Sequence, residues 1–375
     1  MKRIYLDYAA TTPVDKRVVK AMLAYFTEKF GNTMSIHGLG QEAKLVLENS
    51  REIVAGLIKA NPSEIFFTGS ATESNNTVLK GVRKGHIIIS EIEHPCIMET
   101  AEWLESQGIE ITRIKVDKEG LIDPLDVKKA IKKETVLVSI IHASNEIGTI
   151  QDIQKISQIC QDAGVLFHTD ASQSFGKIPI DIKNIDLLTA SSHKMYGPKG
   201  VALLYKKEGV NLSPLLHGGG QENGLRSSTV NIPAIVGFAK ACEIAKKEMK
   251  EESQRLTKLR NKLIKNVLKI KNSYLTGHPT KRLPNSASFR FDFVEGESVA
   301  IMLDLKGIAI STGSACSSMK LEPSYVLMAL GLKHEQAHGS IRISLGKETT
   351  EKEIDYLIKV LPDVINKLRE ISPFK

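Results

Sequence analysis

Short apolar runs and helical segments alternate along the chain up to about residue 205. The apolar runs lie at residues 65–68, 87–89, 109–116, 136–141, 165–168, 187–188 and 201–205. Between them, apolar residues recur at spacings of three and four, which is typical of amphipathic helices. Strands that alternate with helices form a mostly parallel sheet with helices on both faces. The pattern therefore predicts an α/β fold.

The two ends of the chain have different patterns. Residues 4–13 form a short strand that runs into small residues and a proline, which indicates an arm rather than a domain. Further helices are expected at residues 16–30, 41–59 and 233–271. After them, residues 287–293 alternate with a period of two, as a half-buried strand does. We therefore expect a large domain at residues 15–255 and a smaller α+β domain made of residues 1–14 and 256–375.

Two helix starts carry capping signals. Asp123 precedes Pro124, which is the arrangement of an N-cap followed by proline at the first helical position. Residues 350–353 read Thr-Glu-Lys-Glu, which is a capping box before the last helix. These signals place one helix in each predicted domain.

Composition narrows the class of protein. The chain has 375 residues, with 42% hydrophobic and 25% charged residues, as soluble globular proteins have. It contains no apolar run long enough for a membrane span, and Asp7 comes too early for a secretory signal. We therefore expect no membrane association and a cytoplasmic location. Four cysteines stand far apart without metal-ligand spacing, so neither a disulfide framework nor a metal site is indicated.

The chain is basic, with a formal net charge of +8. Part of the excess lies in residues 258–271, where lysines and an arginine interleave with apolar residues at helical spacing. A solvated helix face explains this pattern, and an acidic partner or an RNA backbone is the alternative. Because no aromatic and basic surface motif accompanies it, we do not expect direct nucleic-acid binding.

A lysine follows one predicted strand in a setting that suits chemistry. Lys194 lies in the segment 191–200, which comes directly after the apolar run 185–190 and contains the turn residues Gly197 and Pro198. An amine attacks a carbonyl when desolvation or nearby positive charge lowers its pKa. A solvated lysine in a turn is the ordinary alternative, and residues elsewhere in the chain have to decide between the two.

Polar residues also follow other predicted strands. Residues 68–76 leave a strand and open a helix, which suits a phosphate but also fits a plain capped helix. Asp170 follows a buried strand, where a carboxylate needs a partner such as a protonated pyridine nitrogen, an ion-paired residue or a cap. His94 follows another strand and could stack on a flat cofactor, shuttle protons or be solvated.

These motifs together resemble a known enzyme family. They lie at residues 6–13, 69–76, 93–94, 144–148, 168–173, 191–200, 218–222, 311–318 and 342–346. The chain resembles the fold-type I pyridoxal-phosphate enzymes, and within them the class V aminotransferase-like group that contains the NifS/IscS-like cysteine desulfurases. The resemblance implies a mostly parallel seven-stranded sheet sandwiched by helices, with a smaller α+β domain.

The resemblance also assigns roles to residues around the cofactor, pyridoxal 5'-phosphate. Lys194 binds the cofactor covalently as a Schiff base, His94 stacks on its ring, Asp170 holds its pyridine nitrogen and Gln173 faces its phenolic oxygen. The phosphate is held near Ala71 by Thr72, Ser191 and His193, and Thr229 reaches the phosphate in the other subunit of a homodimer. Asn145 lies beside cofactor and substrate, and Arg342 binds the substrate carboxylate, to which a guanidinium is well matched.

Cys316 has unusual surroundings for a cysteine. Cys160 and Cys242 lie in apolar helical patterns, which predicts small buried core residues. Cys316 lies among Ser, Gly, Ala and Thr, with no apolar period to bury it. By resemblance it is the catalytic nucleophile, on a longer loop typical of desulfurases that serve iron-sulfur cluster assembly and tRNA thiolation. We expect its segment, residues 311–320, to be among the least protected parts of the fold.

The chain departs from many relatives at three places. It has Ser144 in place of Asn, Ser228 in place of Gly, and Thr33-Met34 in place of Pro-Ser. The first two changes leave the catalytic groups intact but bear on the substrate contacts and the phosphate contacts between subunits, and the third lies in a loop near the site to which no role is assigned. The catalytic set implied by the resemblance is Lys194, Cys316 and His94.

The function that follows is a dimeric L-cysteine desulfurase. It converts L-cysteine to L-alanine, forms a persulfide on Cys316, and passes the sulfur to an acceptor such as an iron-sulfur scaffold or a tRNA-thiolation sulfurtransferase. An aminotransferase or a selenocysteine lyase on the same scaffold is the nearest alternative. A scaffold that has lost catalysis and an RNA-binding protein are the alternatives from other classes.

Overall fold

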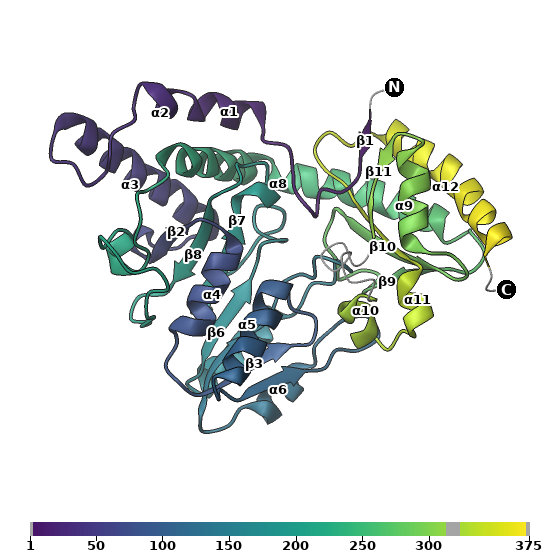
Figure 1. Cartoon of the computed structure of the whole chain (residues 1–375), viewed down its shortest axis with the longest axis horizontal. Coiled ribbons are helices and arrows are strands. Elements are labelled where there is room, and N and C mark those ends of the chain that lie inside the picture. The colour runs from purple at the N-terminus through teal and green to yellow at the C-terminus, as the bar shows by residue number, and fades with distance from the viewer. Residues whose placement is uncertain (1–2, 313–322, 373–375) are drawn as a thin grey trace.

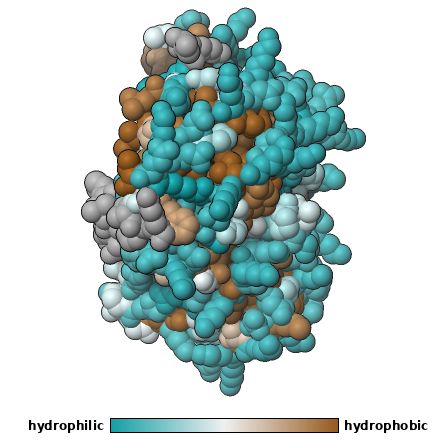
Figure 2. Space-filling view, turned by 90° about the vertical axis from the view of Figure 1, so that its right-hand side faces the viewer, coloured by the Kyte–Doolittle hydropathy of each residue, from teal (hydrophilic) through white to brown (hydrophobic). Residues whose placement is uncertain are grey.

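The structure is a computed structural model that describes residues 3–312 and 323–372. It contains a large sheet on one side and a small antiparallel sheet on the other, each packed against its own helices (Figure 1). On the small-domain side the surface is mostly hydrophilic, with apolar groups gathered in its upper half (Figure 2). Among the described residues, no helix combines the length and the apolar character needed to cross a bilayer.

The large sheet has seven strands, as expected. In spatial order they are β2 (Ile65–Thr68), β8 (Ala202–Lys206), β7 (Leu187–Ser191), β6 (Leu166–Asp170), β5 (Thr135–Ser139), β3 (His86–Ser90) and β4 (Ile111–Ile114). Strand β8 runs antiparallel to both of its neighbours, and the other pairs are parallel. The prediction of a mostly parallel sheet is therefore confirmed.

Helices cover both faces of this sheet. Side chains on one face share a core with α3 (Gly38–Ile58), α6 (Pro124–Ala130), α7 (Ile153–Asp162) and the first half of α8 (Ile232–Val267). Those on the other face pack on α4 (Ala71–Gly81) and α5 (Pro95–Ser106). The alternation within a strand produces this division, because Ile65 and Phe67 enter the first core and Phe66 enters the second.

The small domain is built on an antiparallel sheet. Its strands in order are β12 (Ser311–Thr312), β13 (Ser340–Ser344), β10 (Ser286–Phe291) and β9 (Ser273–Thr276). Its helices are α9 (Gly296–Asp304), α10 (Tyr325–Ala329), α11 (His334–His338) and α12 (Glu351–Ile371). The core of this domain combines the sheet with α9, α12 and the end of α8. Residues 287–293 were expected to be a strand, and β10 confirms that prediction.

Helix α8 connects the two cores. Phe238 in its first half is buried in the core of the large sheet, and Leu263 near its end is buried in the small-domain core. The helix was expected to run to residue 271 but ends at Val267, where the Ser273 hydroxyl donates to the Val267 carbonyl at 2.9 Å. The Ser273 hydroxyl thus satisfies a carbonyl that the helix leaves unpaired.

The N-terminal segment is an arm that joins both parts. Strand β1 (Ile4–Tyr5) pairs in parallel with β11 (Ile308–Ala309), and Leu6 is buried in the small-domain core. Thr12, further along the arm, donates its hydroxyl to the His193 carbonyl at 2.9 Å on the large sheet. The arm therefore crosses from one domain to the other.

The capping signals are confirmed. The Asp123 side chain accepts from the Leu125 N–H, with Pro124 at the first helical position, and Thr350 and Glu353 form the capping box of α12. The predicted helix at residues 16–30 is instead two short helices, α1 (Lys16–Met22) and α2 (Ala24–Thr27). Most side chains of this segment are exposed or half-buried, so packing against the core contributes little to keeping it in one continuous helix.

Candidate active site

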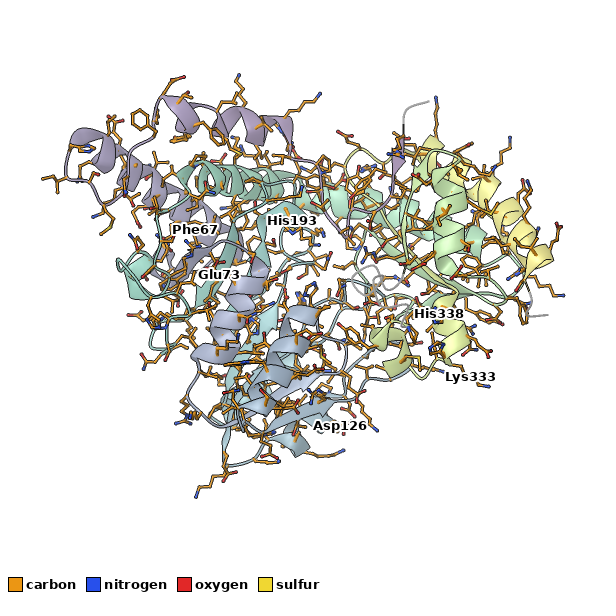
Figure 3. The ribbon with its side chains drawn as sticks, in the orientation of Figure 1. Phe67, Glu73, Asp126, His193, Lys333 and His338 are labelled. Carbon is orange, nitrogen blue, oxygen red and sulfur yellow. The ribbon has the colours of Figure 1, made fainter. Side chains whose placement is uncertain are left out.

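The site lies at the carboxyl ends of the central parallel strands, where ligands bind in open α/β sheets. Asp170 ends β6, and Ser191 ends β7. Lys194 closes the short 3₁₀ helix η2 (Ser192–Lys194) that follows β7, and His94 precedes α5. Figure 3 shows His193 at the end of the large sheet nearer to the small domain. The sheet topology thus gathers residues that are far apart in the sequence.

The arm lies directly against Lys194. The Lys194 Nζ donates to the carbonyls of Ala9 and Ala10, each at 2.7 Å. The next residue of the arm, Thr11, places its hydroxyl 3.0 Å from Nδ1 of His193. The amine of Lys194 thus lies within hydrogen-bond distance of two backbone carbonyls of the arm.

Asp170 is a buried carboxylate, with 4% of its surface exposed. Its Oδ2 accepts from Nδ2 of Asn75 at 2.7 Å, and its Oδ1 accepts from the Ser172 N–H at 2.8 Å. Both partners are uncharged, and a buried carboxylate is costly without a cation. A protonated pyridine nitrogen supplies that cation, so Asp170 fits the cofactor that the resemblance implies.

His94 is the N-cap of α5. Its Nδ1 accepts from the Cys96 N–H at 3.2 Å, so this nitrogen carries no proton and Nε2 does. Burial lowers the pKa of His94, the Asp170 charge opposes that change, and the Lys194 charge adds to it. The imidazole is therefore neutral, and Nε2 is the nitrogen that can exchange a proton with a neighbour.

The expected phosphate residues lie on two elements that pack together. Ala71 and Thr72 open α4, whose N-cap is Ser70, and this helix contacts β7, which Ser191 ends. Free N–H groups at a helix N-terminus favour an anion. Burial lowers the pKa of His193 to about 4, and the charge of Lys194 contributes, so His193 is a neutral side chain. The hydroxyl of Ser192 is buried and makes no hydrogen bond within the described residues.

Arg342 reaches the site from strand β13. It is 4% exposed, and its Nη2 donates to Oδ1 of Asp7 at 2.8 Å. Its Nη1 donates to the Asn145 carbonyl at 2.9 Å, whereas its buried Nε has no partner in the part of the chain that is described. The guanidinium thus keeps an unused donor beside one carboxylate, which suits a second carboxylate.

Two further expected residues lie in different places. Gln173 is buried, and its Nε2 donates to the Ala9 carbonyl at 2.9 Å, beside Lys194. Thr229 is exposed and lines a separate cavity with Gly69 and Arg226. Cys316, the expected nucleophile, and most of its predicted segment lie outside the described residues.

Several buried groups near the site received no role from the sequence. Asn75 holds Asp170, as above, although the motif at residues 68–76 gave no reason to single it out. Burial raises the pKa of Glu93 to about 8 and that of Glu146 to about 7. Glu146 accepts a short hydrogen bond from Ser324. Asn75 and Asp170 are far apart in the sequence, as are Glu146 and Ser324, so no local pattern predicts these contacts.

The other cysteines are poor nucleophiles. Cys160 and Cys242 are buried in apolar cores, which confirms their prediction as core residues. Cys96 lies nearer to the site, where its Sγ is 3.1 Å from Nδ2 of Asn75. Burial, with the Asp170 charge, raises the pKa of Cys96 to about 12, so its reactive thiolate is scarce at neutral pH.

Comparison with known proteins shows extensive similarity. The chain is 52% identical over 377 residues to "Cysteine desulfurase IscS 1" of Archaeoglobus fulgidus, covering 98% of each chain. It is 50% identical over 385 residues to "Cysteine desulfurase IscS" of Dictyoglomus turgidum, covering 100% of this chain and 98% of the relative.

Solved structures agree with this similarity. A structure titled "NIFS-LIKE PROTEIN" superposes with a TM-score of 0.92 at 40% identity, covering 97% of this chain and 100% of that chain. A NifS-like protein from Rickettsia africae gives a TM-score of 0.90 at 34% identity, covering 97% and 99% of the two chains. The model of the family described as "Aminotransferase class-V" matches residues 4–357. The chain therefore belongs to the aminotransferase class-V family.

Proposed function

We propose that this protein is a cysteine desulfurase, which converts L-cysteine to L-alanine and leaves the sulfur on its own cysteine as a persulfide. The observation that carries the proposal is the 52% identity to a cysteine desulfurase over 98% of the chain. Family membership implies pyridoxal 5'-phosphate as the cofactor. When bound, this cofactor withdraws electrons from the substrate Cα, and the protein supplies orientation and proton transfer.

Three side chains of the large domain divide the work at the cofactor. Asp170 would hold the charge of the pyridine nitrogen, because the two partners of its buried carboxylate among the described residues are uncharged. Lys194 would hold the cofactor, and its amine is the group that would move the Cα proton of the substrate. His94 presents Nε2–H, because its Nδ1 is occupied by the backbone of α5. Each of these roles matches the contacts that hold the side chain.

Arg342 and Asn145 orient the substrate. The substrate carboxylate would bind the guanidinium of Arg342, whose Nε has no partner among the described residues. Asn145 accepts from Arg342 through its backbone, which leaves its side-chain amide for the substrate or cofactor. A rigid guanidinium would hold the substrate carboxylate in one orientation.

The nucleophile of the proposed reaction is Cys316. Its thiolate attacks the substrate sulfur, the carbon–sulfur bond breaks, and the carbon takes a proton, so cysteine and thiol become alanine and persulfide. The described ends of its segment are both attached at the site: Ser311 pairs with Arg342, and Ser324 donates to Glu146.

One turnover with labelled cysteine tests this function. We expect alanine as the product and a mass increase of roughly 32 daltons, one sulfur atom, on Cys316. Cys316→Ser should keep the cofactor absorbance but stop both products, whereas Cys96→Ala should keep both because that thiol is buried and protonated. A keto acid product would indicate an aminotransferase, and normal alanine release by Cys316→Ser would refute the nucleophile.

We also propose that the protein is a homodimer in which Thr229 reaches the partner's phosphate site. Large apolar side chains are exposed between α1 and α3, including Phe26 (59%), Phe30 (65%) and Ile36 (94%). Exposed apolar patches of this kind mark protein interfaces. Phe26→Glu combined with Ile36→Glu should yield monomers in sedimentation, whereas Leu305→Glu, at an exposed site of the small domain, should not.

The domain bounds, the sulfur acceptor and the location of the protein also belong to the proposal. We propose that the large domain covers residues 15–255 and that residues 1–14 and 256–375 form the small domain, with α8 spanning the boundary. The sulfur acceptor would be an iron-sulfur scaffold or a tRNA-thiolation sulfurtransferase, and the cytoplasmic location stays a prediction. Capture of acceptor proteins after loading with labelled cysteine separates the two acceptor classes, and transfer of label to neither would contradict both.

A further inference from the structure

Lys177 is a lysine beside the site to which no role has been assigned. It lies four residues after Gln173 and is half-buried. Its Nζ donates to Oε1 of Gln173 at 3.4 Å. Within residues 3–312 and 323–372, it forms no ion pair with a carboxylate. Holding an ammonium group partly out of water without a counter-charge is costly, so the position calls for an explanation.

The contact with Lys177 determines how the Gln173 amide is turned. The Lys177 amine donates to Gln173, so the atom of Gln173 that faces it is the carbonyl oxygen Oε1. At the other end, the Ala9 carbonyl only accepts, so the atom that faces it at 2.9 Å must be Nε2. Because both neighbours require the same orientation, the amide has one arrangement rather than two.

The same carbonyl links this amide to the catalytic lysine. The Ala9 oxygen accepts from Gln173 and, at 2.7 Å, from Lys194. The contacts therefore run from Lys177 through Gln173 to the arm and on to Lys194. Nε2 has two hydrogens, and Ala9 uses one of them, which leaves the second for another acceptor.

The surroundings of Lys177 favour action on the site over a structural ion pair. Burial lowers the pKa of Lys177 to about 7, and the charges of Lys194 and Arg342 add to this effect. Lys177 also borders a cavity between the domains. The titratable groups that line this cavity with it are Tyr196, Glu248, Glu252 and Lys347. Glu248 already pairs with Arg17 and Lys347, so it is not reserved for Lys177.

We propose that Lys177 is a positioning residue, which holds Oε1 of Gln173 so that the free Nε2 hydrogen points at the phenolic oxygen of the cofactor. The inference rests on the proposed function, because that function places the phenolic oxygen opposite Gln173. A hydrogen bond to this oxygen stabilises its anion. Losing the bond should therefore raise the pH at which the visible absorbance band of the holoenzyme changes.

The test measures that pH midpoint without substrate, in the full-length holoenzyme. Lys177→Met, which removes the donor but keeps a long side chain, should raise the midpoint by about one pH unit. Lys177→Arg should restore most of the shift, since a guanidinium also donates to Oε1. Gln173→Ala should raise the midpoint at least as far as Lys177→Met.

A double substitution separates positioning from a direct charge effect. If Lys177 acts through Gln173, then Lys177→Met should add no shift in the Gln173→Ala background. Additive shifts, or an unchanged midpoint in Lys177→Met, would overturn the proposal. A wild-type protein that binds no pyridoxal phosphate would instead contradict the proposed function and the inference with it, so the two failures can be told apart.

Discussion

The two sides of the site are held in place by different kinds of contact. On the large-domain side, Asp170 ends strand β6 and Lys194 follows strand β7, so paired neighbours in a buried sheet set their positions. On the small-domain side, Arg342 is held by Asp7, which is 335 residues away in the sequence, and by the Asn145 carbonyl of a loop. Sheet topology fixes the first side, and contacts between distant segments fix the second.

This difference separates chemistry from recognition. In the proposed reaction, the groups that would transfer protons or stabilise charge follow strands of the large sheet, where small displacements are costly. The group that would bind the substrate carboxylate, Arg342, lies on strand β13 of the small sheet and pairs with Asp7 of the arm. Substitutions on the first side should therefore reduce turnover, and those on the second should chiefly reduce affinity.

The largest expected effect is on the sheet side. Lys194→Ala should reduce alanine formation by at least about 10³-fold, because it removes both the cofactor attachment and the group that moves the Cα proton. Lys199→Ala is the control, since that lysine is exposed five residues further on. Borohydride reduction and mass spectrometry should find the cofactor on Lys194 in the wild type. Attachment to any other lysine would show that the site is wrongly assigned.

A smaller effect, on stability, is expected for Glu93 on the same side. Burial raises the pKa of Glu93 to about 8, whereas the pKa of a glutamate in the unfolded chain is about 4.5. Between pH 4.5 and pH 8, Glu93 therefore binds a proton in the folded state but not in the unfolded state. The stability that this proton contributes is fully present below pH 4.5 and is lost as the pH rises through 8. Glu93→Gln avoids that loss.

Urea unfolding at several pH values measures the Glu93 effect. At pH 9, Glu93→Gln should be more stable than the wild type by about 3 kcal/mol, and at pH 5 the difference should be much smaller. Gln can still accept from the Ile141 N–H, which donates to Oε1 of Glu93 at 2.8 Å. A difference that does not change with pH would mean that Glu93 is ionised in the folded protein.

The same division explains what could be predicted from the sequence. Asp170 and Lys194 follow apolar runs, and such runs predict strands whose carboxyl ends meet at one edge, so local pattern was sufficient to place them. The Arg342–Asp7 pair was not predictable, because no local signal links residues so far apart. Lys177 lies only four residues from Gln173, so it was missed for another reason: no local pattern shows that Gln173 also contacts the Ala9 carbonyl of the distant arm.

On the small-domain side, the expected loss is one of affinity. Arg342→Ala should raise the KM for cysteine by about 10- to 100-fold with little change in kcat, because the charged hydrogen bonds to the substrate carboxylate are lost. The KM of Arg342→Lys should lie between those of the wild type and Arg342→Ala, since lysine keeps the positive charge but lacks the planar guanidinium that binds a carboxylate with two donors. Arg290→Ala is the control, because Arg290 pairs with Asp292 in the same domain. A fall in kcat equal to the rise in KM would contradict the division of roles.

The smallest expected effect concerns Ser228, on a loop that belongs to neither sheet. Its φ of 145° lies in a region that is nearly confined to glycine. Strain of this kind costs about 1–3 kcal/mol, whereas glycine loses about 0.5–1 kcal/mol in backbone entropy on folding. The strain outweighs the entropy, so Ser228→Gly should stabilise the protein by about 1 kcal/mol.

Urea unfolding of Ser228→Gly beside Ser227→Gly makes this last prediction specific. Ser227 is buried, has no positive φ, and accepts from the Gly220 N–H at 3.3 Å, so its replacement should destabilise the protein. Opposite signs at adjacent positions would show that the loop at the Thr229 cavity retains strain that the strand ends of the large sheet do not have. Destabilisation by both variants would instead mean that the Ser228 side chain stabilises the protein by more than the strained backbone destabilises it. In that case the loop would not differ from the strand ends in stored strain.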